Sequence, residues 1–275
     1  MSRIETRFQA LREEHRAALV TFITAGDPNP QVTVPLMHAL VAAGADMIEL
    51  GVPFSDPMAD GPVIQRASQR ALAHHVSLRQ VLGMAREFRT RDTETPVIVM
   101  GYLNPIEVLG YRVFAREAAA AGVDGAITVD MPPEEAGEFG PALKDHGVDP
   151  IYLVAPNSSD ARIRTISAAG CGFLYYVSLK GVTGAAKLDA RSVAEAVQRI
   201  RTHTDLPVGV GFGITDAESA AAIGAVADAV IVGSALVRLV ESQGEDTQRL
   251  IQSIAALVGE MRKALPRRGA AAGNE

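Results

Sequence analysis

A glutamate inside an apolar run and an aspartate soon after it are the residues of this sequence best suited to acid–base chemistry. Glu49 lies near the C-terminal end of the predicted strand Asp46–Gly51, where a carboxylate is costly unless it is paired or protonated. Asp60 follows in a long loop, 53–61, that contains proline and glycine. If this loop folds back over the strand ends, the two carboxyl groups face each other in different environments and could divide the acid and base roles.

Each carboxylate also has a purely structural explanation. Glu49 could be buried against a core arginine or lysine. Asp60, like Asp56 before Pro57, could belong to a turn that opens a helix at Pro62. Residue type alone leaves both explanations open for the aspartates, whereas the position of Glu49 at a strand end favours a functional role.

Glycine clusters mark the ends of three late strands. They are Gly181–Gly184, Gly211–Gly213 and Gly233–Ser234. Glycine lets backbone N–H groups approach an anion closely, and a helix N-terminus adds favourable partial charge. Neither of the last two clusters contains lysine or arginine, so we predict a phosphate site built from neutral N–H groups. Tight turns in a glycine-rich fold are the alternative.

Other common chemistries lack support in the sequence. The six histidines are not spaced as metal ligands, so no metal site is predicted. The single cysteine, Cys171, has no neighbouring histidine or cysteine and is interpreted as a small apolar residue. No Gly-x-Ser-x-Gly motif occurs, and Lys180 lies in a loop rather than a strand, which disfavours serine and Schiff-base catalysis.

Eight short apolar runs, separated by helical patterns, must position these residues. The runs are Ala18–Thr24, Asp46–Gly51, Pro96–Gly101, Asp124–Val129, Asp149–Val154, Gly172–Val177, Pro207–Phe212 and Asp228–Gly233. They are continuously apolar, as expected for strands covered on both faces. The predicted helices include Val32–Ala43, Ile106–Ala121, Glu134–His146, Ser159–Ala169 and Thr215–Ile223, and the segment 52–94 should hold two more, starting near Pro62 and Ser77.

This alternation predicts an α/β protein with a single (β/α)8 TIM barrel over residues 1–265, an extra N-terminal helix at the barrel bottom and a frayed tail at 266–275. An open, doubly wound sheet is the alternative, but no Gly-x-Gly-x-x-Gly loop follows the first strand. Barrel active sites form from the loops that follow the strands. The long connections 52–94 and 178–188 are therefore the first places to expect a site.

Composition and charge argue against several classes of protein. The chain has 275 residues and a net charge of -6, and its basic residues are dispersed, which disfavours nucleic-acid binding. Its longest apolar stretches are far shorter than the ~20 residues that a membrane span requires, and the charged N-terminus has no signal-peptide core. A single cysteine fits a reducing compartment. We therefore expect a soluble, cytoplasmic protein.

One long motif, ELGVPFSDPMADGPVIQ at 49–65, resembles the signature of the tryptophan synthase alpha chain family. Supporting matches, in order along nearly the whole chain, are FITAGDP at 22–28, MGYLNPI at 100–106, VDMPPEE at 129–135, GVTG at 181–184, GFGI at 211–214 and GSA at 233–235. Two positions depart from the usual family pattern. Leu179-Lys180 follow Ser178 where arginine is common, and Met131 stands where leucine is common.

The resemblance implies a carbon–carbon/carbon–oxygen lyase of tryptophan biosynthesis, which cleaves indole-3-glycerol phosphate to indole and glyceraldehyde 3-phosphate by a retro-aldol reaction. Glu49 would be the general acid–base and Asp60 its partner at the indole nitrogen. The phosphate ligands implied are Gly184, Gly213, Gly233 and Ser234. The substrate-binding residues implied are Phe22, Met100, Tyr102, Tyr175, Thr183 and Phe212.

The resemblance also implies a partner, a beta chain that receives indole within an alpha2-beta2 heterotetramer. Pyridoxal phosphate (PLP) would belong to that partner, so no cofactor is expected in this chain. The contact loops implied are 53–61, 102–108 and 130–135. A stand-alone indole-releasing lyase and a non-catalytic activating subunit are alternatives. Another phosphosugar barrel is disfavoured because it would commonly need metal-ligating histidines at strand ends or a lysine acid within a strand.

Overall fold

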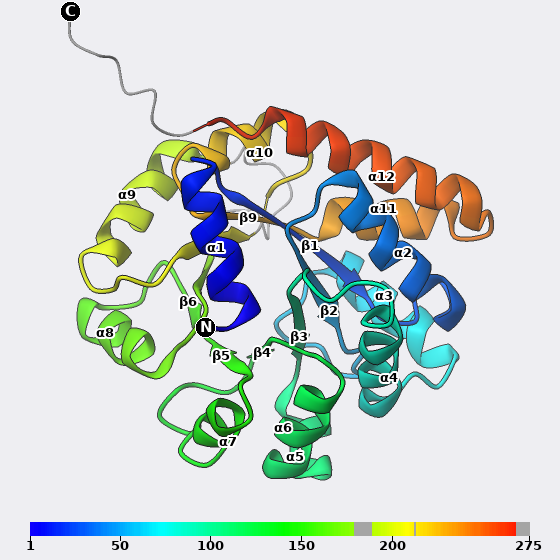
Figure 1. Ribbon diagram of the computed structural model, residues 1–275, viewed down its shortest axis with the longest axis horizontal. Helices are drawn as coiled ribbons and strands as arrows, with labels where there is room; N and C mark the ends of the chain where they lie inside the picture. The colour runs from blue at the N-terminus through cyan, green and yellow to red at the C-terminus, as the bar shows by residue number, and fades with distance from the viewer. Residues whose placement is uncertain (179–188, 212, 268–275) are drawn as a thin grey trace, which may run out of the picture.

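Parallel strands form the centre of the molecule, with helices around them (Figure 1). The computed structural model describes residues 1–178, 189–211 and 213–267. Its strands are β1 (Ala18–Thr24), β2 (Met47–Gly51), β3 (Val97–Gly101), β4 (Gly125–Thr128), β5 (Asp149–Ile151), β6 (Leu153–Val154), β7 (Leu174–Val177), β8 (Val208–Gly211) and β9 (Ala229–Val232).

One helix precedes the first strand, and the other helices lie between the strands or after the last one. They are α1 (Arg3–Glu13), α2 (Pro30–Ala43), α3 (Pro62–Ala73), α4 (Leu78–Phe88), α5 (Leu103–Leu109), α6 (Tyr111–Ala120), α7 (Phe139–Asp145), α8 (Asp160–Ala169), α9 (Ala190–Arg201), α10 (Ala217–Gly224), α11 (Ser234–Gln243) and α12 (Thr247–Ala264).

The sheet closes into a barrel through one interrupted strand. The strand order is β5-β4-β3-β2-β1-β9-β8-β7-β6, with every pair parallel. The two ends of this order, β5 and β6, are separated only by Tyr152, so the predicted run Asp149–Val154 pairs with β4 through its first half and with β7 through its second. The predicted (β/α)8 barrel is confirmed. Its boundary at residue 265 stays a prediction, and residues 268–275 lie outside the described part.

The barrel interior is a packed core with a plug at one end. Alternate strand residues point inward because side chains along a strand alternate in direction, and they form a cluster that includes Val20, Met47 and Ile98. The expected N-terminal helix, α1, lies at the bottom and adds Ile4, Phe8 and Leu11 to the same cluster. The Phe8 and Phe173 ring centroids are 5.8 Å apart. This end of the barrel is therefore filled, and any site must lie at the other.

The two predicted helices in the long connection after β2 are confirmed. Pro62 is the first residue of α3, where its missing N–H costs no hydrogen bond. Ser77 caps α4, because its hydroxyl accepts from the N–H of Gln80 while the Gln80 side chain accepts from the N–H of Ser77.

Two other predicted helices were wrong in extent. The predicted helix Ile106–Ala121 is two helices, α5 and α6, because Gly110 adopts a positive φ of 90° and ends the first. The predicted helix Glu134–His146 is helical only over Phe139–Asp145. The segment before it forms turns, in which the N–H of Glu135 donates to the carbonyl of Pro132.

Three aspartates repeat one hydrogen-bond pattern at the starts of strands. They are Asp46, Asp124 and Asp228. The backbone N–H of each aspartate donates to the carbonyl of a residue in the neighbouring strand, and the N–H of that same residue donates to the aspartate's carboxylate. For Asp124 the residue is Val97, at 2.8 Å for both bonds. These three aspartates thus fix strand alignment at the bottom of the barrel.

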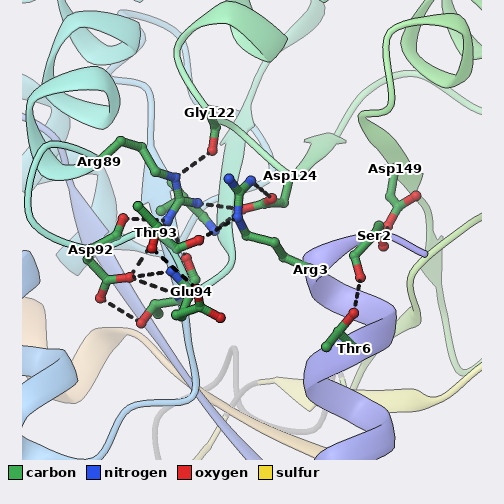
Figure 2. A network of polar contacts seen from close by, with 12 residues as sticks. Ser2, Arg3, Thr6, Arg89, Asp92, Thr93, Glu94, Gly122, Asp124 and Asp149 are labelled. Carbon is green, nitrogen blue, oxygen red and sulfur yellow. Dashed lines mark hydrogen bonds and ion pairs between the residues drawn. The ribbon is translucent and has the colours of Figure 1, made fainter.

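Arginines form ion pairs with these carboxylates and balance their negative charge. Figure 2 shows Asp124 between Arg3 and Arg89, whose guanidinium nitrogens lie 2.7 and 2.5 Å from its two oxygens. Nearby, the Ser2 hydroxyl donates to Asp149 at 2.7 Å. Helix α1 is therefore tied to the barrel by polar contacts as well as by its apolar face.

Among the helices of the described ranges, none combines the length and the apolar character that crossing a membrane would need.

Replacing Asp124 with asparagine should lower the free energy of unfolding by about 3 kcal/mol, because two guanidinium groups lose a buried counter-ion. Urea unfolding followed by circular dichroism measures the change. Glu195→Gln is the matched control: it removes an ion pair with Arg191 in which both side chains are exposed, and should leave the midpoint unchanged. Equal midpoints for both variants would contradict the structural role of Asp124.

Candidate active site

A cavity of about 1390 Å³ opens at the C-terminal ends of the strands, opposite the plugged end. Strand ends, the loop before α3, the loop before α8 and the starts of α10 and α11 all contribute to it. Its lining includes Phe22, Glu49, Asp60, Ile64, Met100, Leu153, Arg162, Tyr175, Gly213, Ile231, Gly233, Ser234 and Arg238. The cavity therefore brings together side chains from almost the whole length of the chain, as expected for a barrel active site.

Glu49 is buried in the wall of this cavity without a counter-ion. It lies on β2 opposite Phe22 of β1, and its side chain is 1% exposed. Its Oε2 atom has no hydrogen-bond partner among the described residues, and no arginine or lysine of those residues contributes to the shift of its pKa. Burial, with a smaller contribution from the negative charge of Asp60, raises the pKa of Glu49 to about 8. At neutral pH this carboxyl group holds a proton and faces the cavity, as a general acid requires.

Asp60 is held beside the cavity by a tyrosine from another strand end. The Tyr102 hydroxyl donates to Oδ2 of Asp60 at 3.0 Å and accepts from the N–H of Ala59 at 2.9 Å. Burial raises the pKa of Asp60, and the Tyr102 hydrogen bond opposes that rise. The hydrogen bond favours the charged form of Asp60, whereas no such contact opposes the rise in the pKa of Glu49.

The turn explanation does not account for Asp60. The residue that caps α3 is Gly61, with no side-chain hydrogen bond, so the Asp60 carboxylate is not used as a helix cap. Asp56, in contrast, is exposed, and within the described residues its carboxylate accepts only from the neighbouring Ser55 hydroxyl, at 2.5 Å. Loop 53–61 also packs through Phe54, which stacks on Tyr102 with centroids 5.0 Å apart.

Three of the predicted substrate-binding residues line the main cavity. They are Phe22, Met100 and Tyr175. Burial raises the pKa of the Tyr175 phenol, and the nearby Glu49 and Asp60 charges add to the rise. Gly211 leaves room for this phenol, because a Cβ atom at Gly211 would lie 2.2 Å from its oxygen.

Tyr102 lies elsewhere. It borders a smaller cavity of about 10 Å³ beside Asp60 rather than the main one. Thr183, Gly184 and Phe212, also predicted as site residues, lie outside the described residues.

The predicted phosphate residues that are described line the cavity just after the two paired strands β8 and β9. Gly213 has a positive φ of 78°, and Gly233 and Ser234 form the start of α11. The first N–H groups of a helix have no partner within it and carry partial positive charge, so this part of the cavity suits an anion.

The sequence reasoning missed the two arginines that line the cavity. Arg162 of α8 and Arg238 of α11 both line the cavity. Arg238 lies four residues after Ser234, on the same face of a helix, and that spacing was the available signal. Arg162 pairs with Glu134, a contact between distant segments that no local pattern reveals.

A search of the described residues finds no group of three or more His, Cys, Asp or Glu side chains that could hold a metal ion.

Comparisons with known proteins agree on one family. The model for the family described as tryptophan synthase alpha chain matches residues 8–266. A tryptophan synthase alpha chain of Thioalkalivibrio sulfidiphilus (strain HL-EbGR7) is 63% identical over 265 residues, which cover 96% of this chain and 100% of that protein. The alpha chain of Nitrosococcus oceani is 62% identical over 265 residues, covering 96% and 98%.

A solved structure shares the fold. The crystal structure of tryptophan synthase subunit alpha from Legionella pneumophila str. Paris has a TM-score of 0.90 and 47% sequence identity, and the match covers 96% of this chain and 98% of that one.

The raised pKa of Glu49 makes the stability of the fold depend on pH. In the unfolded chain this carboxyl ionises near 4.5, whereas in the folded protein it stays protonated up to about 8. Its contribution to stability is therefore complete below pH 4.5 and is lost as the pH rises through 8. The glutamine of the Glu49→Gln variant cannot ionise. The free energy of unfolding of this variant, minus that of the wild type, should therefore increase by about 3 kcal/mol from pH 5 to pH 8.

Urea unfolding of both proteins at the two pH values measures this difference. Asp56→Asn serves as the control, since Asp56 is exposed. If the free energies of unfolding of the wild type and Glu49→Gln differ by the same amount at both pH values, Glu49 is already ionised in the folded protein.

Proposed function

The chain belongs to the tryptophan synthase alpha chain family and catalyses the alpha reaction of that enzyme, and we propose that Glu49 and Asp60 carry out this reaction at the barrel mouth. The reaction is the cleavage of indole-3-glycerol phosphate to indole and glyceraldehyde 3-phosphate, which makes the protein a lyase that breaks a carbon–carbon bond. The observation that carries the assignment of residues is Glu49, which lines the cavity, is buried without a hydrogen-bond partner for its Oε2 atom among the described residues, and has Asp60 in the same lining.

Glu49 supplies the first proton. Its carboxyl O–H protonates C3 of the indole ring, the ring π electrons form the new C3–H bond, and positive charge develops at the ring nitrogen. Asp60 accepts a hydrogen bond from that N–H and stabilises the charge. An apolar wall keeps Glu49 neutral until the proton is delivered.

The second step returns the proton to Glu49. The carboxylate just formed removes a proton from the hydroxyl on the adjoining glycerol carbon. The electron pair of that O–H bond becomes the aldehyde C=O, the bond to indole C3 breaks, and its electrons restore the aromatic ring. Glu49 thus ends the cycle protonated, and no cofactor of this chain takes part.

The phosphate group is held at the other end of the cavity. We propose that N–H groups near Gly213, Gly233 and Ser234 bind it, with Gly184 from the predicted loop. Phe22, Met100 and Tyr175 would contact the indole ring, with Thr183 and Phe212 as further predicted contacts and Tyr102 acting through Asp60. Holding both ends of the substrate places its reacting carbon against Glu49, which lowers the entropic part of the barrier.

We also propose that the chain works with a beta chain, in an alpha2-beta2 assembly in which PLP belongs to the partner. The names of the relatives support a beta partner, since they are alpha chains. Two of the large apolar side chains that are most exposed, Met58 at 85% and Val108 at 84%, lie in the predicted contact loops 53–61 and 102–108. A cytoplasmic location stays a prediction.

Glu49→Gln should lower the rate of indole release by about 10²–10⁴-fold, because the amide cannot donate or take back the proton. The assay follows indole release from indole-3-glycerol phosphate, with and without a purified beta chain. Unchanged circular dichroism shows that the fold is intact. Normal turnover by the variant would remove Glu49 from the mechanism.

Asp60→Asn should lower kcat by about 10²–10³-fold, because the neutral amide no longer stabilises the positive charge at the ring nitrogen. Binding of glycerol 3-phosphate, which occupies only the phosphate end, should change little. Asp56→Asn is the matched control in the same loop, since Asp56 is exposed and does not line the cavity. Full activity of Asp60→Asn together with a lower melting temperature would indicate a structural residue.

A further inference from the structure

A second, much smaller cavity lies beside Asp60, at the C-terminal ends of β1, β2 and β3. Its volume is about 10 Å³, and its lining is Phe22, Thr24, Gly51, Val52, Asp60, Ile64, Ser68, Met100, Gly101, Tyr102 and Val129. A space of this size holds roughly one water molecule, provided that polar groups surround it. Hydroxyl and carboxyl groups supply that surrounding here, whereas the rest of the lining is apolar.

Thr24 presents a buried hydroxyl to this cavity. It follows Phe22 by two residues on β1, so both side chains point to the inside of the barrel. The residue is 4% exposed, and its Oγ1 has no hydrogen-bond partner in the described parts of the chain. A buried hydroxyl without a partner is strongly unfavourable, which makes such a group rare in native proteins.

Asp60 also lines this cavity. Tyr102 donates to Oδ2, and none of the described residues donates to Oδ1. A carboxylate can accept several hydrogen bonds, so a single donor leaves the charged form only partly stabilised. Ser68, which is also 4% exposed, adds a second hydroxyl to the lining.

We propose that one water molecule occupies this cavity, accepts a hydrogen bond from the Thr24 hydroxyl and donates one to the Asp60 carboxylate, so that Thr24 is a positioning residue for Asp60. The inference rests on the proposed role of Asp60 in the reaction. The water gives Thr24 its missing partner and gives Asp60 a second donor, opposite Tyr102. With both donors in place, the carboxylate keeps one orientation toward the ring N–H of the substrate.

Thr128 provides a matched control. It is also buried, at 7% exposed, and its Oγ1 also has no partner among the described residues. It borders neither the main cavity nor the small one. If an unpartnered threonine hydroxyl were merely a defect of packing, valine should have the same effect at both positions.

The experiment compares Thr24→Val, Thr24→Ser and Thr128→Val in the full chain. Thr24→Val should lower kcat about tenfold, as expected when a charged group loses a hydrogen bond, while KM changes less than about twofold. Thr24→Ser keeps the hydroxyl and should retain most of the wild-type kcat. Thr128→Val should keep full activity and raise the urea midpoint, and Thr24→Val should not raise it.

A high-resolution crystal structure of the wild type tests the site without an activity assay. An ordered water within about 3.2 Å of both Thr24 Oγ1 and an Asp60 oxygen is expected. An empty cavity, or a Thr24→Val variant with wild-type kcat and a raised midpoint, would overturn the proposal. Full turnover by Asp60→Asn would instead overturn the catalytic role of Asp60 and leave the crystallographic test of the water site intact.

Discussion

The chemistry proposed for this protein depends on a carboxyl group that is buried without a cation. Glu49 is 1% exposed, and the described structure offers it no arginine or lysine. Any cation at ion-pair distance would lower its pKa and remove the proton that the reaction needs. The apolar wall around β2 and the negative charge of Asp60 act in the same direction, so the barrel holds an acid that is ready at neutral pH.

Buried carboxyl groups have different surroundings at the two ends of the barrel. At the bottom, Asp46 and Asp124 are as buried as Glu49, but arginines neutralise them and strand N–H groups donate to them. Those aspartates fix the alignment of the strands. At the top, Glu49 has no such partner. The carboxylates that stabilise the fold thus lie at one end of the barrel and the proposed catalytic carboxyl group at the other. This separation allows the mouth to hold Glu49, whose burial is unfavourable.

Small residues determine the shape of the cavity at the barrel mouth as much as large residues do. Gly211 leaves the space that the Tyr175 ring occupies, and Gly51 leaves space for the Phe22 ring, because a Cβ atom at Gly51 would lie 2.6 Å from that ring. The phosphate end combines Gly213 with the start of α11, and Arg238 adds a positive charge to the lining one turn later. An elongated, anionic substrate with one flat apolar end matches this distribution of groups.

The sequence by itself determined the barrel, the plug helix and the strand-end position of Glu49, because apolar periodicity and glycine punctuation are local properties of the chain. It also showed where α3 and α4 begin, through Pro62 and Ser77. Only the tertiary structure decided between a turn and a site for Asp60, because the Tyr102 hydroxyl that binds it comes from a segment 42 residues away. The same holds for the unpartnered Thr24 hydroxyl and for the split of the fifth strand at Tyr152. Each depends on which atoms meet after the barrel has closed, and a linear pattern does not record such contacts.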